Sequence, residues 1–244
     1  MRALHESLER SRIAHWEPTF QVCASKAHGT DSRVMSIKPE SILATVETWV
    51  REKLEESGGI AHGWLHTERV RYHIRALAPT EGVDPLLAEL AALLHDIGRA
   101  VPGPEAEHGT RAANLARSIL ADLPLSDDQR ESVLHAIRWH NSQRADTALL
   151  RVLRDADMLD GMGAVGIMRA FMTRSHLPPY DPASPFQANG SPWALATCSD
   201  QILAQRRWLD YLNTDTAREM ARERVAFMDT FLAQAQGELP TTEE

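Results

Sequence analysis

The stretch from Leu86 to Gly98 constrains the fold of this chain more than any other. Asp84 is a favourable N-cap residue, a proline occupies the first helical position, and leucine and alanine dominate the residues after it, so we expect a buried helix. The apolar run ends on His95 and Asp96, and Gly98 stands where a helix would stop. An imidazole and a carboxylate are costly to bury side by side unless something pairs with them, and a metal ion would pair with both.

The rest of the chain predicts helices almost throughout. Apolar residues recur at helical spacing from residue 40 onward, and no stretch carries a credible β-hairpin signal. Ser126 and Gln129 form a capping-box pattern that opens one of these helices. Besides the central helix, we expect helices over residues 40–57, 64–77, 108–120, 127–140, 148–159, 165–172, 195–212 and 216–235.

These helices predict an all-α protein, a single-domain helical bundle over residues 39–236, followed by a polar tail over residues 237–244. Residues 1–38 have a loop-like composition, and we interpret them as a weakly ordered extension. The alternative is a short helix from Leu4 to Trp16 docked on the body. Met35 is a candidate translation start, so we expect residues 1–34 to be dispensable for the metal site.

Charge and composition exclude several classes of partner. The 244 residues carry a net charge of −8, which disfavours nonspecific binding of nucleic acid. No apolar run is long enough to span a bilayer, and the N-terminus lacks the apolar segment of a secretory signal. The sequence has two cysteines, Cys23 and Cys198, and they lack CxxC spacing, which indicates a reducing, cytoplasmic setting. We therefore expect a cytoplasmic protein with neither nucleic acid nor a membrane as its partner.

Two further residues join the central pair as candidate metal ligands. His66 lies on the helix before the central one, and Asp157 lies in apolar surroundings near the end of a later helix. Each alone is more simply a surface or satisfied core residue. A helical bundle can project such side chains inward from different helices. Imidazole and carboxylate ligands together suit Mn, Mg, Co, Ni, Fe or Zn, and they do not distinguish sharply among these metals.

The order His66, His95-Asp96, Asp157, with the flanks His66-x-x-Arg69 and Leu93–Gly98, resembles the HD-domain metal-dependent phosphohydrolases. Residues 155–171, 180–182 and 213–217 resemble a narrower bacterial branch, often called YedJ-like. The resemblance covers residues 42–236 and implies an all-α HD-domain fold with a divalent metal held by those four residues. Members of this branch include enzymes that split nucleoside triphosphates into monophosphate and pyrophosphate.

Three more histidines have a suggestive context. The branch usually has an aspartate directly after the histidine that is His62 here, whereas this chain has Gly63. His62 is four residues before His66, so it either touches a substrate phosphate or caps the helix. His108 and His140 either hold a second metal, as in some HD enzymes, or line the pocket as phosphate donors, and we favour a single metal.

Catalysis at a phosphoryl centre also needs positive charge and an oriented water. Asp96 would be both a ligand and an orienting group, and Arg69 and Arg99 are the nearest cations in the sequence. Arg111 and Arg144 are weaker candidates, which we interpret as surface residues. The proline-rich loop with Tyr180 and Asp181 is a candidate lid or base pocket.

The resulting hypothesis is a divalent-metal-dependent phosphohydrolase. Its expected substrate is a small phosphorylated molecule, a nucleotide such as a nucleoside triphosphate or another phosphate ester. One alternative is a noncatalytic metal-holding or ligand-sensing module. Another is a di-iron oxygenase, which would require His108 and His140 as ligands.

Overall fold

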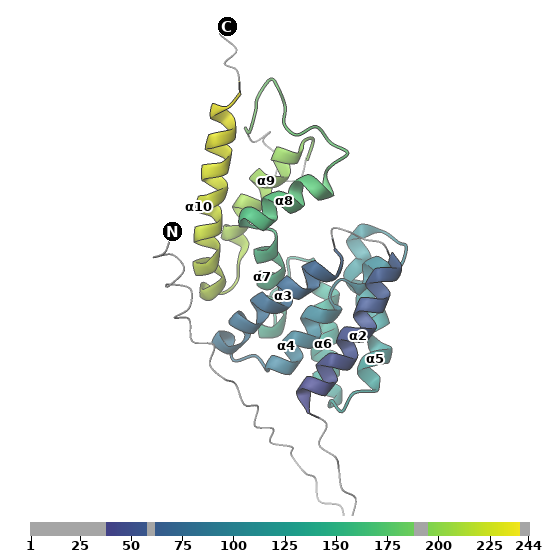
Figure 1. The fold of residues 1–244 in the computed structure, drawn as a ribbon. Coiled ribbons are helices and arrows are strands. Elements are labelled where there is room, and N and C mark those ends of the chain that lie inside the picture. Colours follow the sequence, from purple (N-terminus) through teal and green to yellow (C-terminus); the bar gives the residue numbers. More distant parts are fainter. Residues whose placement is uncertain (1–37, 58–61, 188–194, 240–244) are drawn as a thin grey trace, which may run out of the picture. The chain divides into compact units, whose positions relative to one another are not determined.

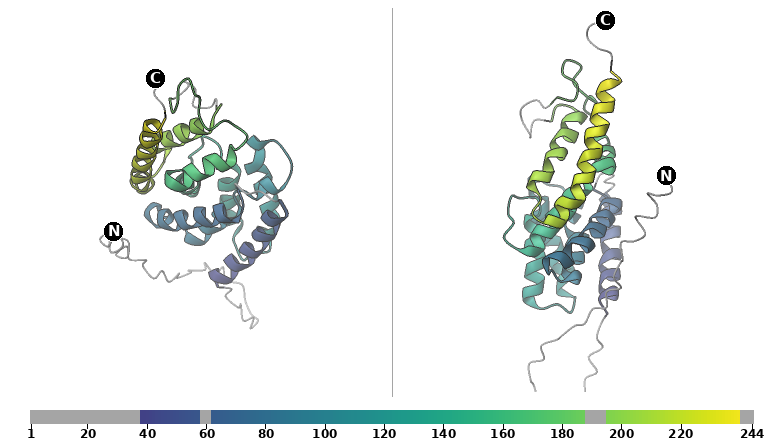
Figure 2. Two further views of the ribbon diagram at one scale, coloured as in Figure 1. Left: turned by 45° about the horizontal axis from the view of Figure 1, so that its top comes forward. Right: turned by 90° about the vertical axis from the view of Figure 1, so that its left-hand side faces the viewer.

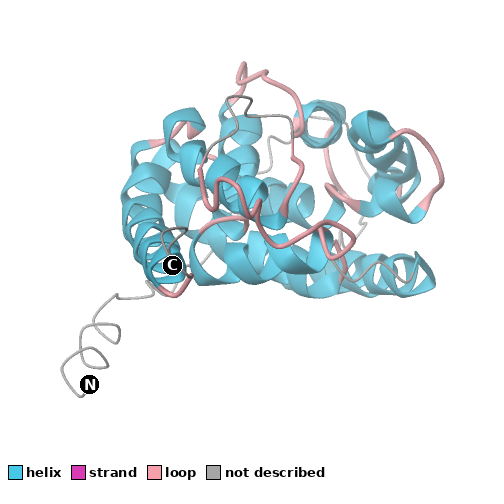
Figure 3. Ribbon diagram, turned by 90° about the horizontal axis from the view of Figure 1, so that it is seen from above, coloured by secondary structure: helices cyan, strands magenta, loops and turns pink. Residues whose placement is uncertain are grey.

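The computed structural model describes residues 38–57, 62–187 and 195–239, and within these ranges it contains helices and no strand (Figures 1 and 3). The α-helices are α2 (Pro39–Ser57), α3 (Trp64–Leu77), α4 (Pro85–Leu94), α5 (His108–Ala121), α6 (Asp127–Trp139), α7 (Ala148–Asp160), α8 (Gly163–Thr173), α9 (Cys198–Arg206) and α10 (Asp215–Gly237). Short 3-10 helices are η1 (Ala78–Glu81), η2 (Ile97–Ala100), η3 (Glu105–Glu107) and η4 (Arg207–Tyr211). The all-α prediction is therefore confirmed.

Some sequence expectations fall outside these ranges. The extension over residues 1–38, with Met35 and the alternative helix from Leu4 to Trp16, is described only at residue 38. Of the polar tail over residues 237–244, the structure describes residues 237–239, and α10 extends to Gly237.

The core lies around α4, which contacts α2, α3, α6 and α7. Leu90, Leu93 and Leu94 of this helix are fully buried, as the absence of a polar face predicts. α3 also packs on α7, and α5 packs on α6. α10 runs beside α8 and α9 (Figure 2) and also contacts α7. None of the helices in the described ranges is long and apolar enough to cross a membrane.

Local capping sets several helix starts where the sequence predicts them. Asp84 accepts hydrogen bonds from the backbone N–H groups of Leu86 and Leu87, at 2.8 and 3.2 Å. Ser126 and Gln129 form both bonds of the predicted capping box at the start of α6. Such bonds satisfy backbone donors that have no partner inside the helix.

The predicted end of the central helix is wrong. α4 ends at Leu94, His95 is its C-cap, and the chain turns at Asp96 before entering η2. The reason is tertiary: η2 lies so close to α5 that a Cβ added to Gly98 would lie 2.1 Å from the His108 carbonyl oxygen. The helix expected over residues 195–212 likewise begins later, at Cys198, and changes to a 3-10 helix at Arg207.

A buried carboxylate joins α7 to the start of α10. Asp155 accepts hydrogen bonds from the backbone N–H groups of Asn213 and Thr214, at 2.8 to 3.0 Å, and from the Asn213 side chain at 2.7 Å. Asp155 is fully buried, so these bonds offset the cost of removing its charge from water. They hold in place the helix that carries Asp157.

Candidate active site

The structure brings the four predicted ligands together from three parts of the chain. His66 comes from α3, Asp157 from α7, and His95 and Asp96 from the turn after α4. The Nε2 atom of His66 lies 3.2 Å from His95 Nε2, 3.5 Å from Asp96 Oδ2 and 3.4 Å from Asp157 Oδ1. His95 Nε2 lies 3.7 Å from the same Asp96 oxygen. Two imidazole nitrogens and two carboxylate oxygens thus converge on one point.

Hydrogen bonds on the far side of each ring orient both imidazoles. His66 Nδ1 lies 2.7 Å from Asp160 Oδ2, and His95 Nδ1 lies 2.8 Å from the Ala92 carbonyl oxygen. If each Nδ1–H donates to these oxygens, each neutral ring presents the lone pair of Nε2 to the cluster. Lone pairs at 3.2 Å repel unless a cation lies between them.

The electrostatics of the cluster favour a bound cation. Burial lowers the pKa of His95 to about 4, so its ring is neutral at pH 7. Burial opposes charge on His66, but hydrogen bonds to Asp160 and Asp96 outweigh it and raise its pKa. Burial also opposes charge on Asp96, yet the neighbouring histidines hold its pKa well below the usual range. The donor set therefore fits a divalent metal ion.

A second cluster lies on the other oxygen of Asp96. The Nε2 atoms of His108 and His140 lie 3.0 Å apart, and they lie 3.4 and 3.6 Å from Asp96 Oδ1. Each Nδ1 lies 2.7 Å from a backbone carbonyl oxygen, of Glu105 and Ile137 respectively. Asp96 Oδ1 is buried, and apart from its ion pair with Arg99 it has no hydrogen-bond partner within the described part of the chain. Asp96 thus lies between two pairs of histidines.

Arg99 lies at this second cluster. Its Nε is 2.9 Å from Asp96 Oδ1, and one terminal nitrogen is 3.3 Å from His108 Nε2. Another terminal nitrogen pairs with Glu105. The guanidinium therefore places positive charge beside Asp96, where the sequence predicts it.

Of the two roles left open for His62, contact with a substrate phosphate or capping of α3, the structure does not bear out capping. The N-cap residue is Gly63, and no side chain forms a capping bond there. His62 Nδ1 instead lies 2.8 Å from Asp96 Oδ2. The side chains of His62 and Asp157 are 33% and 34% exposed, whereas those of His66 and Asp96 are buried. His62 and Asp157 therefore mark the side of the cluster that a solute can reach.

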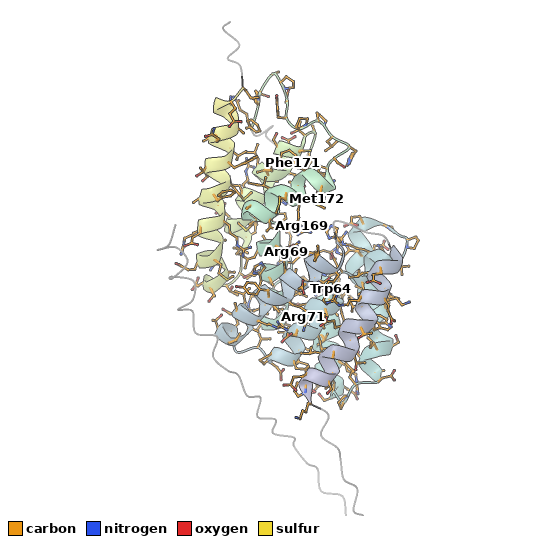
Figure 4. The ribbon with its side chains drawn as sticks, in the orientation of Figure 1. Trp64, Arg69, Arg71, Arg169, Phe171 and Met172 are labelled. Atoms are coloured by element: carbon orange, nitrogen blue, oxygen red, sulfur yellow. The ribbon has the colours of Figure 1, made fainter. Side chains whose placement is uncertain are left out.

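Arg69 meets the cluster through Asp160, which lies within the 155–171 segment but is not among the predicted site residues. Its Nε and one terminal nitrogen donate to the two Asp160 oxygens, the second at 3.1 Å. Arg169 of α8 donates to the same carboxylate at 2.5 Å, and Figure 4 labels both arginines. One signal could have found Asp160: it lies three residues after Asp157, one helical turn further along α7.

The two weaker arginine candidates, Arg111 and Arg144, make their contacts outside the cluster of predicted ligands. Arg111 donates to the carbonyl oxygens of Gly98 and Pro104, at 3.0 and 2.6 Å, so it holds the loop after the central helix. Arg144 lies over the ring of Trp139, at 4.4 Å from its centroid, and is exposed.

Two carbonyl oxygens of the proline-rich loop, of Pro178 and Pro179, accept hydrogen bonds from the backbone N–H groups of Cys198 and Ser199 at the start of α9, whereas Tyr180 and Asp181 make contacts within the loop. The ring of Tyr180 lies 5.4 Å from that of Phe186. Asp181 accepts hydrogen bonds from the backbone of Ala183 and the hydroxyl of Ser184. A role for Tyr180 and Asp181 as a lid or base pocket stays a prediction.

Comparison with known proteins agrees with this fold. A family model described as the HD domain matches residues 63–162, the range that contains all four converging residues. The chain belongs to the HD-domain superfamily, and it is a metal-dependent phosphohydrolase.

Individual relatives cover most of the chain. The uncharacterized protein YpgQ of Bacillus subtilis is 32% identical over 206 residues, which are 80% of this chain and 92% of YpgQ. The crystal structure of YpgQ in complex with ADP covers 81% of this chain and 98% of its own, with 28% identity and a TM-score of 0.62. The structure of an HD-superfamily hydrolase from Bacillus thuringiensis covers 82% and 98%, with 26% identity and a TM-score of 0.66.

Proposed function

We propose that this protein hydrolyses a phosphate bond of a nucleotide, including the bond of a nucleoside triphosphate whose cleavage releases pyrophosphate. The observation that carries the proposal is the convergence of His66, His95, Asp96 and Asp157, at 3.2 to 3.7 Å, beside two arginines. Support for a nucleotide comes from YpgQ, whose crystal structure is a complex with ADP.

Those four residues would hold the divalent ion. When bound, such an ion offsets phosphate charge and lowers the pKa of water towards ~7. Arg69 and Arg99 supply the positive charge that steadies a phosphoryl group as negative charge develops on its oxygens. If Nδ1–H of His62 donates to Asp96, the other nitrogen of the neutral ring can accept a proton from water. The two exposed side chains, His62 and Asp157, define the side of entry.

The second cluster bears on the number of metals. From the sequence we favour one metal, with His108 and His140 as phosphate donors. Burial lowers the pKa of His108, and if both Nδ1–H groups donate to carbonyl oxygens, neutral Nε2 atoms can only accept. This geometry supports the alternative in which His108, His140 and Asp96 Oδ1 hold a second ion. Two ions would clamp the attacking and leaving oxygens.

The test is a substrate screen with the full-length protein. Purified protein is supplied in turn with Mn, Mg, Co, Ni or Fe and given nucleoside mono-, di- and triphosphates and a generic aryl phosphate. We expect metal-dependent release of phosphate or pyrophosphate, and no release by Asp96→Asn. Absence of turnover with every metal would favour the sensing module. Oxygen consumption by the iron-loaded protein would favour the di-iron alternative.

A further inference from the structure

A single buried carboxylate connects a metal-ligating residue of the proposed site to two cations. Asp160 is the last residue of α7, and its side chain is 1% exposed. His66 Nδ1 lies 2.7 Å from Oδ2, Arg69 donates twice, and Arg169 donates once at 2.5 Å. These groups come from α3, α7 and α8.

We propose that Asp160 is a positioning residue that sets the ring of His66 and the guanidinium of Arg69 in one arrangement, with Arg169 as its counter-charge. The inference rests on the proposed function of this site, because it assigns Asp160 a role toward the metal ligand and toward the phosphate. Asp160 itself would touch neither the metal ion nor the phosphate, and it acts through His66 and Arg69.

The first part of this role concerns the imidazole. A carboxylate on the outer nitrogen of a ligating histidine selects the tautomer with a lone pair on the inner nitrogen and holds the ring plane. Asp160 is the group on the outer nitrogen of His66, whereas His95 and His140 have backbone carbonyl oxygens there. Of these three rings, His66 is the one whose outer nitrogen meets a replaceable side chain.

The second part concerns charge. Two guanidinium groups on one carboxylate leave a net positive charge beside the cluster. The side chain of Arg69 is 33% exposed and that of Arg169 is 13% exposed, so Arg69 is the one that a solute can reach. Asp160 accepts from Arg69 through both of its oxygens, a bidentate geometry that restricts the guanidinium plane. A phosphate oxygen would therefore meet a preoriented cation.

Contacts other than the carboxylate hold the backbone at this position, so a change of side chain can be tested in a folded protein. Arg224 of α10 donates to the carbonyl oxygen of Leu159. α8 lies close to the end of α7, since a Cβ on Gly166 would be 2.2 Å from the Gly161 carbonyl oxygen.

The chain offers a matched control in Glu89. This carboxylate of α4 is 12% exposed and also accepts from two arginines of α3, Arg71 at 2.8 Å and Arg75 at 2.6 Å. Within the described residues, its hydrogen bonds go to these arginines and to none of the four proposed ligands. Glu89→Gln therefore removes a comparable ion-pair network without touching the site.

The experiment compares Asp160→Asn with Glu89→Gln in three measurements. Competition with a chelator gives the affinity for Co or Mn alone, long-range 15N NMR reports the His66 tautomer, and kinetics give KM. For Asp160→Asn we expect metal affinity to fall about 10- to 100-fold, mixed tautomers of His66 and a raised KM. Glu89→Gln should lower Tm and leave all three unchanged.

Wild-type metal affinity together with an unchanged His66 tautomer in Asp160→Asn would overturn the proposal. The proposal would also be overturned if Asp160→Asn and Glu89→Gln lowered Tm equally and lowered metal affinity equally. If the asparagine variant does not fold, Asp160→Glu takes its place, because the extra methylene moves the carboxylate oxygens away from His66 and Arg69. The same results for metal affinity and the His66 tautomer would then support or overturn the proposal. The metal and tautomer measurements need no substrate, so they stand even if the search for a nucleotide substrate fails.

Discussion

The Nε2 atoms of His66 and His95 lie 3.2 Å apart, although the two residues are 29 positions apart in the chain. Their outer nitrogens are engaged by Asp160 and the Ala92 carbonyl oxygen, and Asp96 Oδ2 lies within 3.7 Å of both inner ones. Such a group of acceptors is stable only with a proton or a metal ion among them.

Replacing Asp96 by alanine should remove most of the bound metal. One carboxylate oxygen faces each histidine pair, so the variant loses a ligand from both clusters. Elemental analysis of purified protein gives the metal content per chain. Asp128→Ala, on the exposed start of α6, is the control and should keep the wild-type content. Unchanged metal in Asp96→Ala would contradict the assignment.

Replacing Arg69 by alanine should slow hydrolysis while leaving the metal bound. Loss of a charge-assisted hydrogen bond costs about 1.5–3 kcal/mol, which is about ten- to a hundredfold in kcat/KM. Steady-state kinetics on the best phosphate substrate measure the effect. Arg117→Ala removes an exposed arginine paired with Glu131 and should leave the rate unchanged. A wild-type rate for Arg69→Ala would rule out this role.

Replacing Gly98 by alanine should destabilise the protein. The added Cβ would lie 2.1 Å from the His108 carbonyl oxygen and 2.5 Å from the Ala112 nitrogen, so η2 and α5 must separate. Overpacking of this kind costs about 1–3 kcal/mol, seen as a lower Tm in calorimetry. Gly237→Ala, which meets nothing within 4 Å, should change Tm little. Equal Tm values for the two variants would refute the close approach.

Stability should fall on acidification, in part because of His73. Burial and the nearby charge of Arg224 lower the pKa of this histidine from 6.5 to about 4. Between pH 6.5 and 4 the unfolded chain binds a proton that the folded protein does not. The unfolding free energy should therefore decrease as pH falls through this window, by about 3 kcal/mol in all.

Urea unfolding at several pH values measures this dependence. His73→Gln removes the titrating ring and should flatten the curve between pH 6.5 and 4 relative to the wild type. His176→Gln, at an exposed site, should retain the wild-type slope. A wild-type slope in His73→Gln would show that this ring titrates equally in both states.

The sequence by itself determined the helices and the order of the candidate ligands. α3 has the predicted bounds Trp64–Leu77, and the caps at Asp84 and Ser126 form as expected. Helix periodicity and capping depend on residues three or four apart, so they can be read locally. The resemblance to the HD family used the same local information, because it rests on short motifs around His66, His95-Asp96 and Asp157.

Only the tertiary structure decided where the central helix ends and which groups meet the ligands. α4 stops at Leu94 because η2 packs against α5, and His62 meets Asp96 from 34 positions away. The contact between Asp160 and Arg69 is not predicted from the sequence, because Arg69 lies 91 positions earlier in the chain. A buried charge takes the partner that packing brings within reach, and that depends on how the helices pack together rather than on neighbouring residues.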